Sequence, residues 1–196
     1  EDTTTADAEA IDRALLEQVC RELTGLMANW DVSARRLLDS HAPLLRAAKQ
    51  QLHEEGHRKP VNANNFHLTL HFLGMQDEHI LPQLYQVAAE LRSPPFELTL
   101  DQYGLFRHAH CLWLGPQHPA PPLLHLVNRL GESLTQLGLP VSTDYRPHIT
   151  LFRNARAMTQ CPAPALRLQV SEFILYESIS AADGVWYKPL RRWPLL

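Results

Sequence analysis

A four-residue motif of histidine, any residue, threonine and leucine occurs twice in the chain and constrains the fold more than any other feature. The first copy lies in "NNFHLTLHFLG", residues 64–74, and the second lies in "PHITLFRN", residues 147–154. Each copy alternates polar with apolar residues, which predicts a β-strand with one polar face. The second copy follows a predicted strand at 111–115 and a predicted helix at 121–138. The repeat therefore predicts two equivalent halves, each built from a strand, a helix and a His-x-Thr strand.

Elsewhere the spacing of apolar residues separates helices from strands. Apolar residues recur at helical spacing in four segments, residues 11–30, 32–54, 76–92 and 120–138. Alternation and turn residues predict strands at residues 66–73, 94–103, 110–116, 145–152, 166–178 and 185–193, the last two joined by the turn "AADG". This mixture predicts an α+β fold with largely antiparallel sheets.

The leading strand of the first half is the one element that this pattern does not supply. Residues 11–30 have the spacing of a helix, so the weaker alternative is that "LTGLMA", residues 23–28, forms this strand. Residues 1–10 are polar and acidic, and we expect them to form a disordered tail.

Composition limits the class of protein. The length of 196 residues fits one domain, or one domain in two lobes, over residues 1–196. With 45% hydrophobic and 20% charged residues, the chain is predicted to be folded rather than disordered. The net charge of −3 argues against a broad contact with duplex nucleic acid and leaves room for one strand end. The chain has three isolated cysteines, no membrane-spanning run, no signal peptide and no heptad pattern, which together predict a cytoplasmic monomer.

The two motifs place the same pair of functional groups side by side. Residues two apart in a strand share a face, so His67 lies beside Thr69 and His148 beside Thr150. Because imidazole titrates near neutral pH, one ring can accept a proton from water while the other donates one to a leaving oxygen. Threonine hydroxyls can donate hydrogen bonds to the non-bridging oxygens of a phosphate. Two such pairs across a cleft predict hydrolysis of a phosphodiester, or its reverse, without a metal.

A metal site is the alternative for the first motif. "HLTLH" has the spacing of two zinc-binding histidines on a helix, with His71 as the second. The central Leu-Thr-Leu favours a strand, however, and the sequence places neither the glutamate of such a motif nor a third ligand. We therefore expect no metal and no cofactor. His71 shares a strand face with His67 by alternation, so we place it at the border of the site.

The residues around the motifs resemble those of a known family. "PVNANNFHLTLHFLG", "YRPHITLFRN" and "VSEFILYES", with "PPFELTL", "CLWLG" and "YKPLRRW" in the expected order, are similar to the bacterial RNA 2',3'-cyclic phosphodiesterases, also called 2'-5' RNA ligases. These belong to the two-histidine phosphoesterase superfamily. The resemblance runs from Pro60 to the C-terminus. It implies a bilobal fold in which two pseudo-symmetric antiparallel sheets flank a central cleft, with the helices on the outside.

The same resemblance implies a reaction and the residues that carry it. The expected substrate is the 3' end of an RNA, tRNA halves included, or a small cyclic nucleotide, and the expected product is a 2'-phosphate. His67 is expected to donate a proton to the departing 3'-oxygen and His148 to accept a proton from the attacking water, while Thr69 and Thr150 hold the phosphate oxygens. Joining of tRNA halves through a 2'-5' bond, which is the reverse chemistry, and nucleotide binding without turnover are the alternatives.

Further candidates surround these four residues. The resemblance implies that the base stacks on Phe72 and Arg153, each five residues after a motif histidine. Strict alternation turns both side chains away from the histidines, so this role requires each strand to end or to bulge after its leucine. Arg146 and Lys59, which precede the second and the first motif, are candidates for contacts to phosphate or to the RNA backbone.

Overall fold

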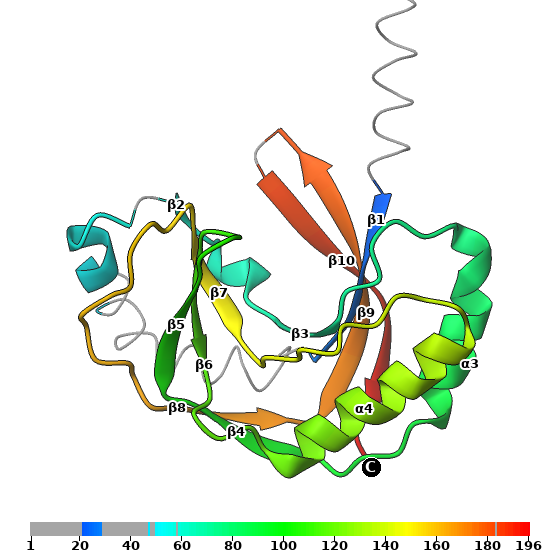
Figure 1. The fold of residues 1–196 in the computed structure, drawn as a ribbon. Helices are drawn as coiled ribbons and strands as arrows, with labels where there is room; N and C mark the ends of the chain where they lie inside the picture. Colours follow the sequence, from blue (N-terminus) through cyan, green and yellow to red (C-terminus); the bar gives the residue numbers. More distant parts are fainter. Residues whose placement is uncertain (1–20, 29–46, 48–49, 58, 183) are drawn as a thin grey trace, which may run out of the picture.

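The computed structural model describes residues 21–28, 47, 50–57, 59–182 and 184–196, whose strands form two four-stranded sheets and one two-stranded sheet (Figure 1). In the first sheet the strand order is β10-β9-β1-β3, formed by Gly184–Pro194, Glu172–Ala181, Arg21–Ala28 and Leu68–His71. The second sheet has the order β2-β7-β6-β5, formed by Lys59–Pro60, Ile149–Arg153, Cys111–Gly115 and Gln102–Phe106. The third pairs β4, Phe96–Leu100, with β8, Leu166–Val170. Neighbouring strands are antiparallel in all three sheets, as the sequence predicts.

Two helices pack against the first sheet. The helix α3, Leu81–Glu90, begins after the 3-10 turn η2, Glu78–Ile80, and contacts β10. The helix α4, Pro121–Gln136, lies beside α3 and contacts β3 (Figure 1). It buries an apolar stripe at helical spacing, formed by Leu123, Leu126, Val127, Leu130 and Leu134. A second short 3-10 turn, η1, Ala63–Asn65, leads into β3. One face of β3 therefore packs against α4.

The sheets share one apolar core. A continuous cluster of buried side chains includes Leu68 of β3, Leu112 of β6, Phe152 of β7 and Leu168 of β8. The strand β6 is buried along its whole length, as expected for a strand with neighbours on both sides and side chains covered on both faces. Because the three sheets are packed through the same cluster, the two motif strands are held in a fixed relation to each other.

The helix predicted at 11–30 is wrong for the part of it that the structure describes. Residues 21–28 form β1, which lies between β9 and β3 and confirms the alternative strand at "LTGLMA". Apolar residues four apart fit a helix, but Thr24 and Gly25 are poor helix formers, and backbone pairing on both sides stabilises the strand. The first half therefore has the leading strand that the repeat predicts.

Other differences from the predicted elements are small. The segment 94–103, predicted as one strand, contains β4 and the start of β5, and the segment 166–178 divides at Ser171 into β8 and β9. The two-residue strand β2 was not predicted. The predicted tail and most of the helix at 32–54 lie outside the described residues. Among the described residues, no helix combines the length and the hydropathy that a membrane crossing requires.

Candidate active site

The strand of the first motif carries a β-bulge. Thr69 pairs with Met27 and His71 pairs with the next residue of β1, Leu26, so Leu70 is an extra residue of β3 without a partner of its own on β1. Without the bulge, His71 would return to the face of Thr69. The bulge instead moves it to the opposite face, where it is buried. The placement of His71 at the border of the site is therefore wrong, because simple alternation does not hold along this strand.

His71 packs against α4. Its Nε2 donates a hydrogen bond to the carbonyl oxygen of Val127 at 2.8 Å. Gly131 of the same helix leaves room for the ring, since a Cβ at this position would lie 3.2 Å from Cε1 of His71. Burial lowers the pKa of His71, which keeps the ring neutral. The second histidine of "HLTLH" thus joins strand to helix.

The strand of the second motif has the same bulge at the equivalent position. Thr150 pairs with Trp113 and Phe152 pairs with Leu112, so Leu151 is the extra residue. In both strands the four residues that follow the motif histidine are, in order, buried, half-buried, buried and buried. The two motifs are therefore equivalent in backbone register and in burial as well as in sequence.

The bulges turn the two base-stacking candidates to the face of the threonines. Arg153 and Thr150 pair with residues that lie two apart on β6, so their side chains share a face. Phe72 comes directly after the end of β3, and continued alternation from His71 predicts that it lies on the face of Thr69. Its side chain is 60% exposed. The bulge that a stacking role requires is thus present in both strands.

Each motif histidine is held by the carbonyl group two residues before it. Nδ1 of His67 lies 2.7 Å from the carbonyl oxygen of Asn65, and Nδ1 of His148 lies 2.6 Å from that of Arg146. A carbonyl oxygen only accepts hydrogen bonds, so Nδ1 carries the hydrogen in both neutral rings. In each ring Nε2 is therefore the nitrogen that can exchange a proton with a bound molecule.

Aromatic side chains contact the two rings, and they differ between the halves. Tyr187 of β10 lies against His67 with the ring centroids 4.5 Å apart. Phe106 of β5 meets His148 edge to face at 4.8 Å, and Trp113 of β6 lies 6.0 Å from the same imidazole. Sequence reasoning missed Phe106 and Tyr187, because both are distant from the motifs in the chain and only the strand register brings them close.

Two glycines make room for the wall beside the second histidine. Gly104 pairs with Trp113 across β5 and β6, and a Cβ at this position would overlap the indole ring. A Cβ at Gly115 would lie 2.5 Å from the carbonyl oxygen of Pro147, the residue before His148. Larger residues at either position would push this wall into the site.

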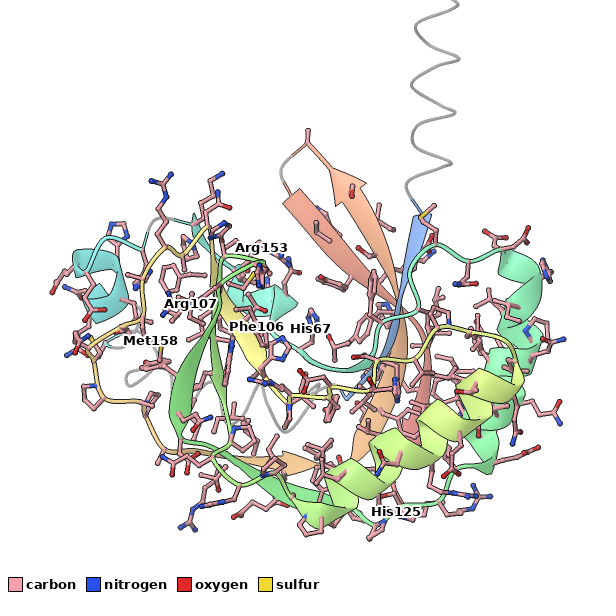
Figure 2. The ribbon with its side chains drawn as sticks, viewed as in Figure 1. His67, Phe106, Arg107, His125, Arg153 and Met158 are labelled. Atoms are coloured by element: carbon pink, nitrogen blue, oxygen red, sulfur yellow. The ribbon has the colours of Figure 1, made fainter. Side chains whose placement is uncertain are left out.

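Burial in this site changes the proton affinity of the first histidine. It lowers the pKa of His67 to about 4, against the opposing effect of the hydrogen bond to Asn65. The charges of His148 and Arg153 lower this pKa further, which they do only because they lie close to His67. Figure 2 shows His67, Phe106 and Arg153 between the second sheet and the β9–β10 hairpin. The structure thus brings the two motifs into one site.

The second histidine is affected in the same direction. Burial lowers the pKa of His148, and the hydrogen bond to the carbonyl of Arg146 opposes this change. Of the two rings, His67 has the more strongly lowered pKa. Both rings are therefore neutral in the empty site at neutral pH. An anion between them would favour their protonated forms.

The two outlying candidates, Arg146 and Lys59, differ in their surroundings. The guanidinium of Arg146 is exposed and pairs with Asp144 at 3.5 Å, so this residue serves the site through its carbonyl group. Lys59 is also exposed, and it pairs across β2 and β7 with Arg153. Of the two, Lys59 is the one next to the candidate stacking residue.

Asn65 links the first histidine to the β9–β10 hairpin. Its Nδ2 donates a hydrogen bond to the carbonyl oxygen of Val185 at 2.7 Å, while its own carbonyl holds His67. We expect Asn65→Ala to lower kcat by about 2- to 10-fold, since one hydrogen bond of about 0.5–1.5 kcal/mol is lost and His67 is less well positioned. The neighbouring Asn64→Ala variant is the control, because no side-chain hydrogen bond of Asn64 is described. Equal kcat values for the two variants would show that the hairpin does not position His67.

The sequence matches the family model described as the 2'-5' RNA ligase superfamily over residues 37–178. The RNA 2',3'-cyclic phosphodiesterase of Escherichia coli is 38% identical over 140 residues, which are 70% of this chain and 80% of the relative. The protein of the same name from Archaeoglobus fulgidus is 29% identical over 145 residues, which are 68% of this chain and 81% of the relative.

Solved structures resemble the fold over a longer part of the chain. The crystal structure of E. coli LigT complexed with 3'-AMP superposes with a TM-score of 0.72 at 30% identity, covering 90% of this chain and 98% of that one. A crystal structure of a Thermus thermophilus protein also gives a TM-score of 0.72, at 25% identity, covering 89% of this chain and 97% of that one. The likeness therefore includes both sheets that carry the motifs.

Proposed function

The chain belongs to the 2'-5' RNA ligase superfamily, and we propose that it hydrolyses the 2',3'-cyclic phosphate at the 3' end of an RNA to a 2'-phosphate. The observation that carries this proposal is the equivalence of the two motifs. Each has a histidine with Nδ1 bound to a carbonyl group, a half-buried threonine beside it and a bulge after the threonine. Such a pair suits a reaction that needs one proton acceptor and one proton donor on either side of a phosphate.

The proposed reaction is an in-line displacement at phosphorus. Nε2 of neutral His148 accepts a proton from water as the water oxygen attacks the phosphorus atom. The bond from phosphorus to the 3'-oxygen breaks, and Nε2 of protonated His67 gives its proton to that oxygen. The product carries a 3'-hydroxyl and a 2'-phosphate, and the two histidines have exchanged protonation states. Ligation is the same displacement with a 5'-hydroxyl in place of water as the nucleophile, and it leaves a 2'-5' phosphodiester and a 3'-hydroxyl.

The remaining groups hold the substrate. The hydroxyls of Thr69 and Thr150 donate hydrogen bonds to the non-bridging oxygens, where negative charge develops in the transition state. In the described part of the chain neither hydroxyl has a hydrogen-bond partner, so both can donate to a ligand. Phe72 and Arg153, on the faces of these threonines, stack on the terminal base. The crystal structure of E. coli LigT complexed with 3'-AMP supports a nucleotide as the kind of ligand.

The pH dependence follows from the lowered pKa values. The profile of kcat/KM reports the free enzyme, in which burial lowers the pKa of His67 to about 4 and that of His148 below its usual 6.5. We expect a bell-shaped profile with its maximum below pH 6.5. The phosphate anion raises both pKa values in the complex, so the maximum of kcat lies at higher pH. Initial rates at saturating and at limiting substrate measure both profiles, and a kcat/KM maximum above pH 6.5 contradicts this account.

The direct test uses an oligoribonucleotide that ends in a 2',3'-cyclic phosphate, with EDTA present. We expect quantitative conversion to the 2'-phosphate, which phosphorus NMR separates from the 3'-phosphate isomer. A 3'-phosphate product would mean that the other ester bond breaks, and the proposed positions of water and leaving oxygen would then be wrong. Absence of any product, with a nucleotide still bound in calorimetry, would favour a binding module instead.

A further inference from the structure

A row of side chains crosses the second sheet at one end. The pairs Phe106–Cys111, Cys111–Arg153 and Arg153–Lys59 join four strands in order, so these side chains share one face. The row begins at Phe106, which contacts His148, and it ends at Lys59 on the edge strand β2. Since neighbouring strands lie about 4.8 Å apart, Lys59 is the next side chain beyond Arg153 towards the edge of the sheet.

Two further cations join this row from the adjoining loops. Arg107 follows Phe106 at the turn between β5 and β6, and Figure 2 shows it at the same end of the sheet as Arg153. Arg156 lies in the loop after β7, next to Ala155, whose N–H donates a hydrogen bond to the carbonyl of His110 at 2.8 Å. Lys59, Arg107 and Arg156 are all exposed. We call these three residues the cationic rim.

The cationic rim makes no ion pair with any of the residues that the structure describes. Four exposed basic side chains elsewhere are paired with carboxylates, in Arg129–Glu132, Arg146–Asp144, Lys188–Glu177 and Arg192–Glu172. The whole chain has a net charge of −3, so an excess of basic residues does not explain the rim. Unpaired like charges at one end of a sheet repel one another, and a bound polyanion would relieve this repulsion.

We infer that the cationic rim binds the phosphates of the nucleotides that precede the cyclic end, so that the preferred substrate is an RNA strand rather than a mononucleotide. This inference rests on the proposed function, which puts the cyclic phosphate beside the two motifs and the terminal base on Arg153. The strand then leaves the site past Arg153, where Lys59 is the next side chain in the row. Contacts of this kind follow the backbone and require no particular base sequence.

The experiment compares two substrates with the same terminal nucleotide, a mononucleoside 2',3'-cyclic phosphate and a short oligoribonucleotide with a cyclic end. Three phosphate contacts to a single strand give log(kcat/KM) a slope of about −2 against log salt concentration. We expect this slope for the oligonucleotide and a much smaller one for the mononucleotide. The triple variant Lys59→Ala, Arg107→Ala, Arg156→Ala should lose roughly tenfold in kcat/KM for the oligonucleotide at low salt, and most of the slope.

The control variant is Arg167→Ala, which removes an exposed arginine of β8 that also lacks a described ion pair. It should behave as the unmodified protein on both substrates. Equal efficiency on the two substrates, or equal losses on both in the triple variant, would overturn the role of the rim and leave the proposed function intact. If neither substrate is hydrolysed, the proposed function fails. RNA binding by the cationic rim is then tested by fluorescence anisotropy with a labelled RNA that ends in a 2'-phosphate. The unmodified protein should bind this RNA in a salt-dependent way, and the triple variant should lose that binding.

Discussion

His67→Ala and His148→Ala each lower kcat for cyclic-phosphate hydrolysis by about 10²- to 10⁴-fold, the usual contribution of a general acid or base. Each change removes the only nitrogen of its motif that can exchange a proton with the phosphate, because Nδ1 is bound to a carbonyl group. His125→Ala is the matched control, since His125 is exposed on α4 and lies away from His67 in Figure 2. Full activity in both motif variants, with folding verified by circular dichroism, would falsify the proposed acid–base pair.

A change of leaving group separates the two proposed roles. An aryl phosphodiester releases a stable phenolate, which needs no proton from an acid. We expect His67→Ala to hydrolyse such a substrate nearly as well as the unmodified protein, whereas His148→Ala stays impaired because water still has to be deprotonated. This test matters because the pKa of His67 is about 4 in the empty site. The opposite pattern of rescue would show that the two histidines have exchanged roles.

The proton that His67 donates depends on the substrate itself. In the empty site, burial keeps the ring neutral, and the nearby charge of Arg153 acts in the same direction. The cyclic phosphate brings one negative charge, and threonine hydroxyls do not neutralise it, so a protonated imidazole becomes favourable beside it. The acid is therefore formed when a phosphate is bound. Neutral ligands of similar shape should bind without this change.

The motif pair could be predicted from the sequence because its signal is local. His67 and Thr69, like His148 and Thr150, lie within one strand each, and their spacing of two residues directly gives a shared face. The family resemblance added the fold, which the structural similarities confirm. The sequence predicts that Arg153 lies on the face of Thr150 only if the strand bulges at Leu151, and this bulge is present.

What the sequence could not give depends on register and on packing between distant segments. A bulge has no clear signature in a strand, so alternation put His71 on the wrong face. The strand β1 is stabilised by pairing with β9 and β3, and apolar spacing alone favoured a helix there. Tyr187 contacts His67 from a segment more than a hundred residues away, and no pattern within either segment records that contact.

The second large effect is expected from the threonines. Thr69→Val and Thr150→Val keep the shape of the side chain and remove the hydroxyl that donates to a phosphate oxygen. Each should lower kcat by about 10²- to 10³-fold, the measured cost of losing one donor to a transition-state oxyanion. Both threonines are half-buried, and neither hydroxyl makes a hydrogen bond to any residue that the structure describes. The hydroxyls therefore need not break an existing hydrogen bond before they donate to a phosphate oxygen.

The split between kcat and KM decides whether the hydroxyls act on the transition state. The cyclic phosphate already carries negative charge, so a donor that binds it equally before and during the reaction changes KM and leaves kcat unaltered. We expect the loss mainly in kcat, since the hydroxyls donate to the non-bridging oxygens, where negative charge develops in the transition state. Thr69→Ser and Thr150→Ser should retain most of the activity. Thr99→Val on β4 is the control for a strand threonine outside the site, and a loss there equal to that of the motif variants would assign the effect to folding rather than to phosphate binding.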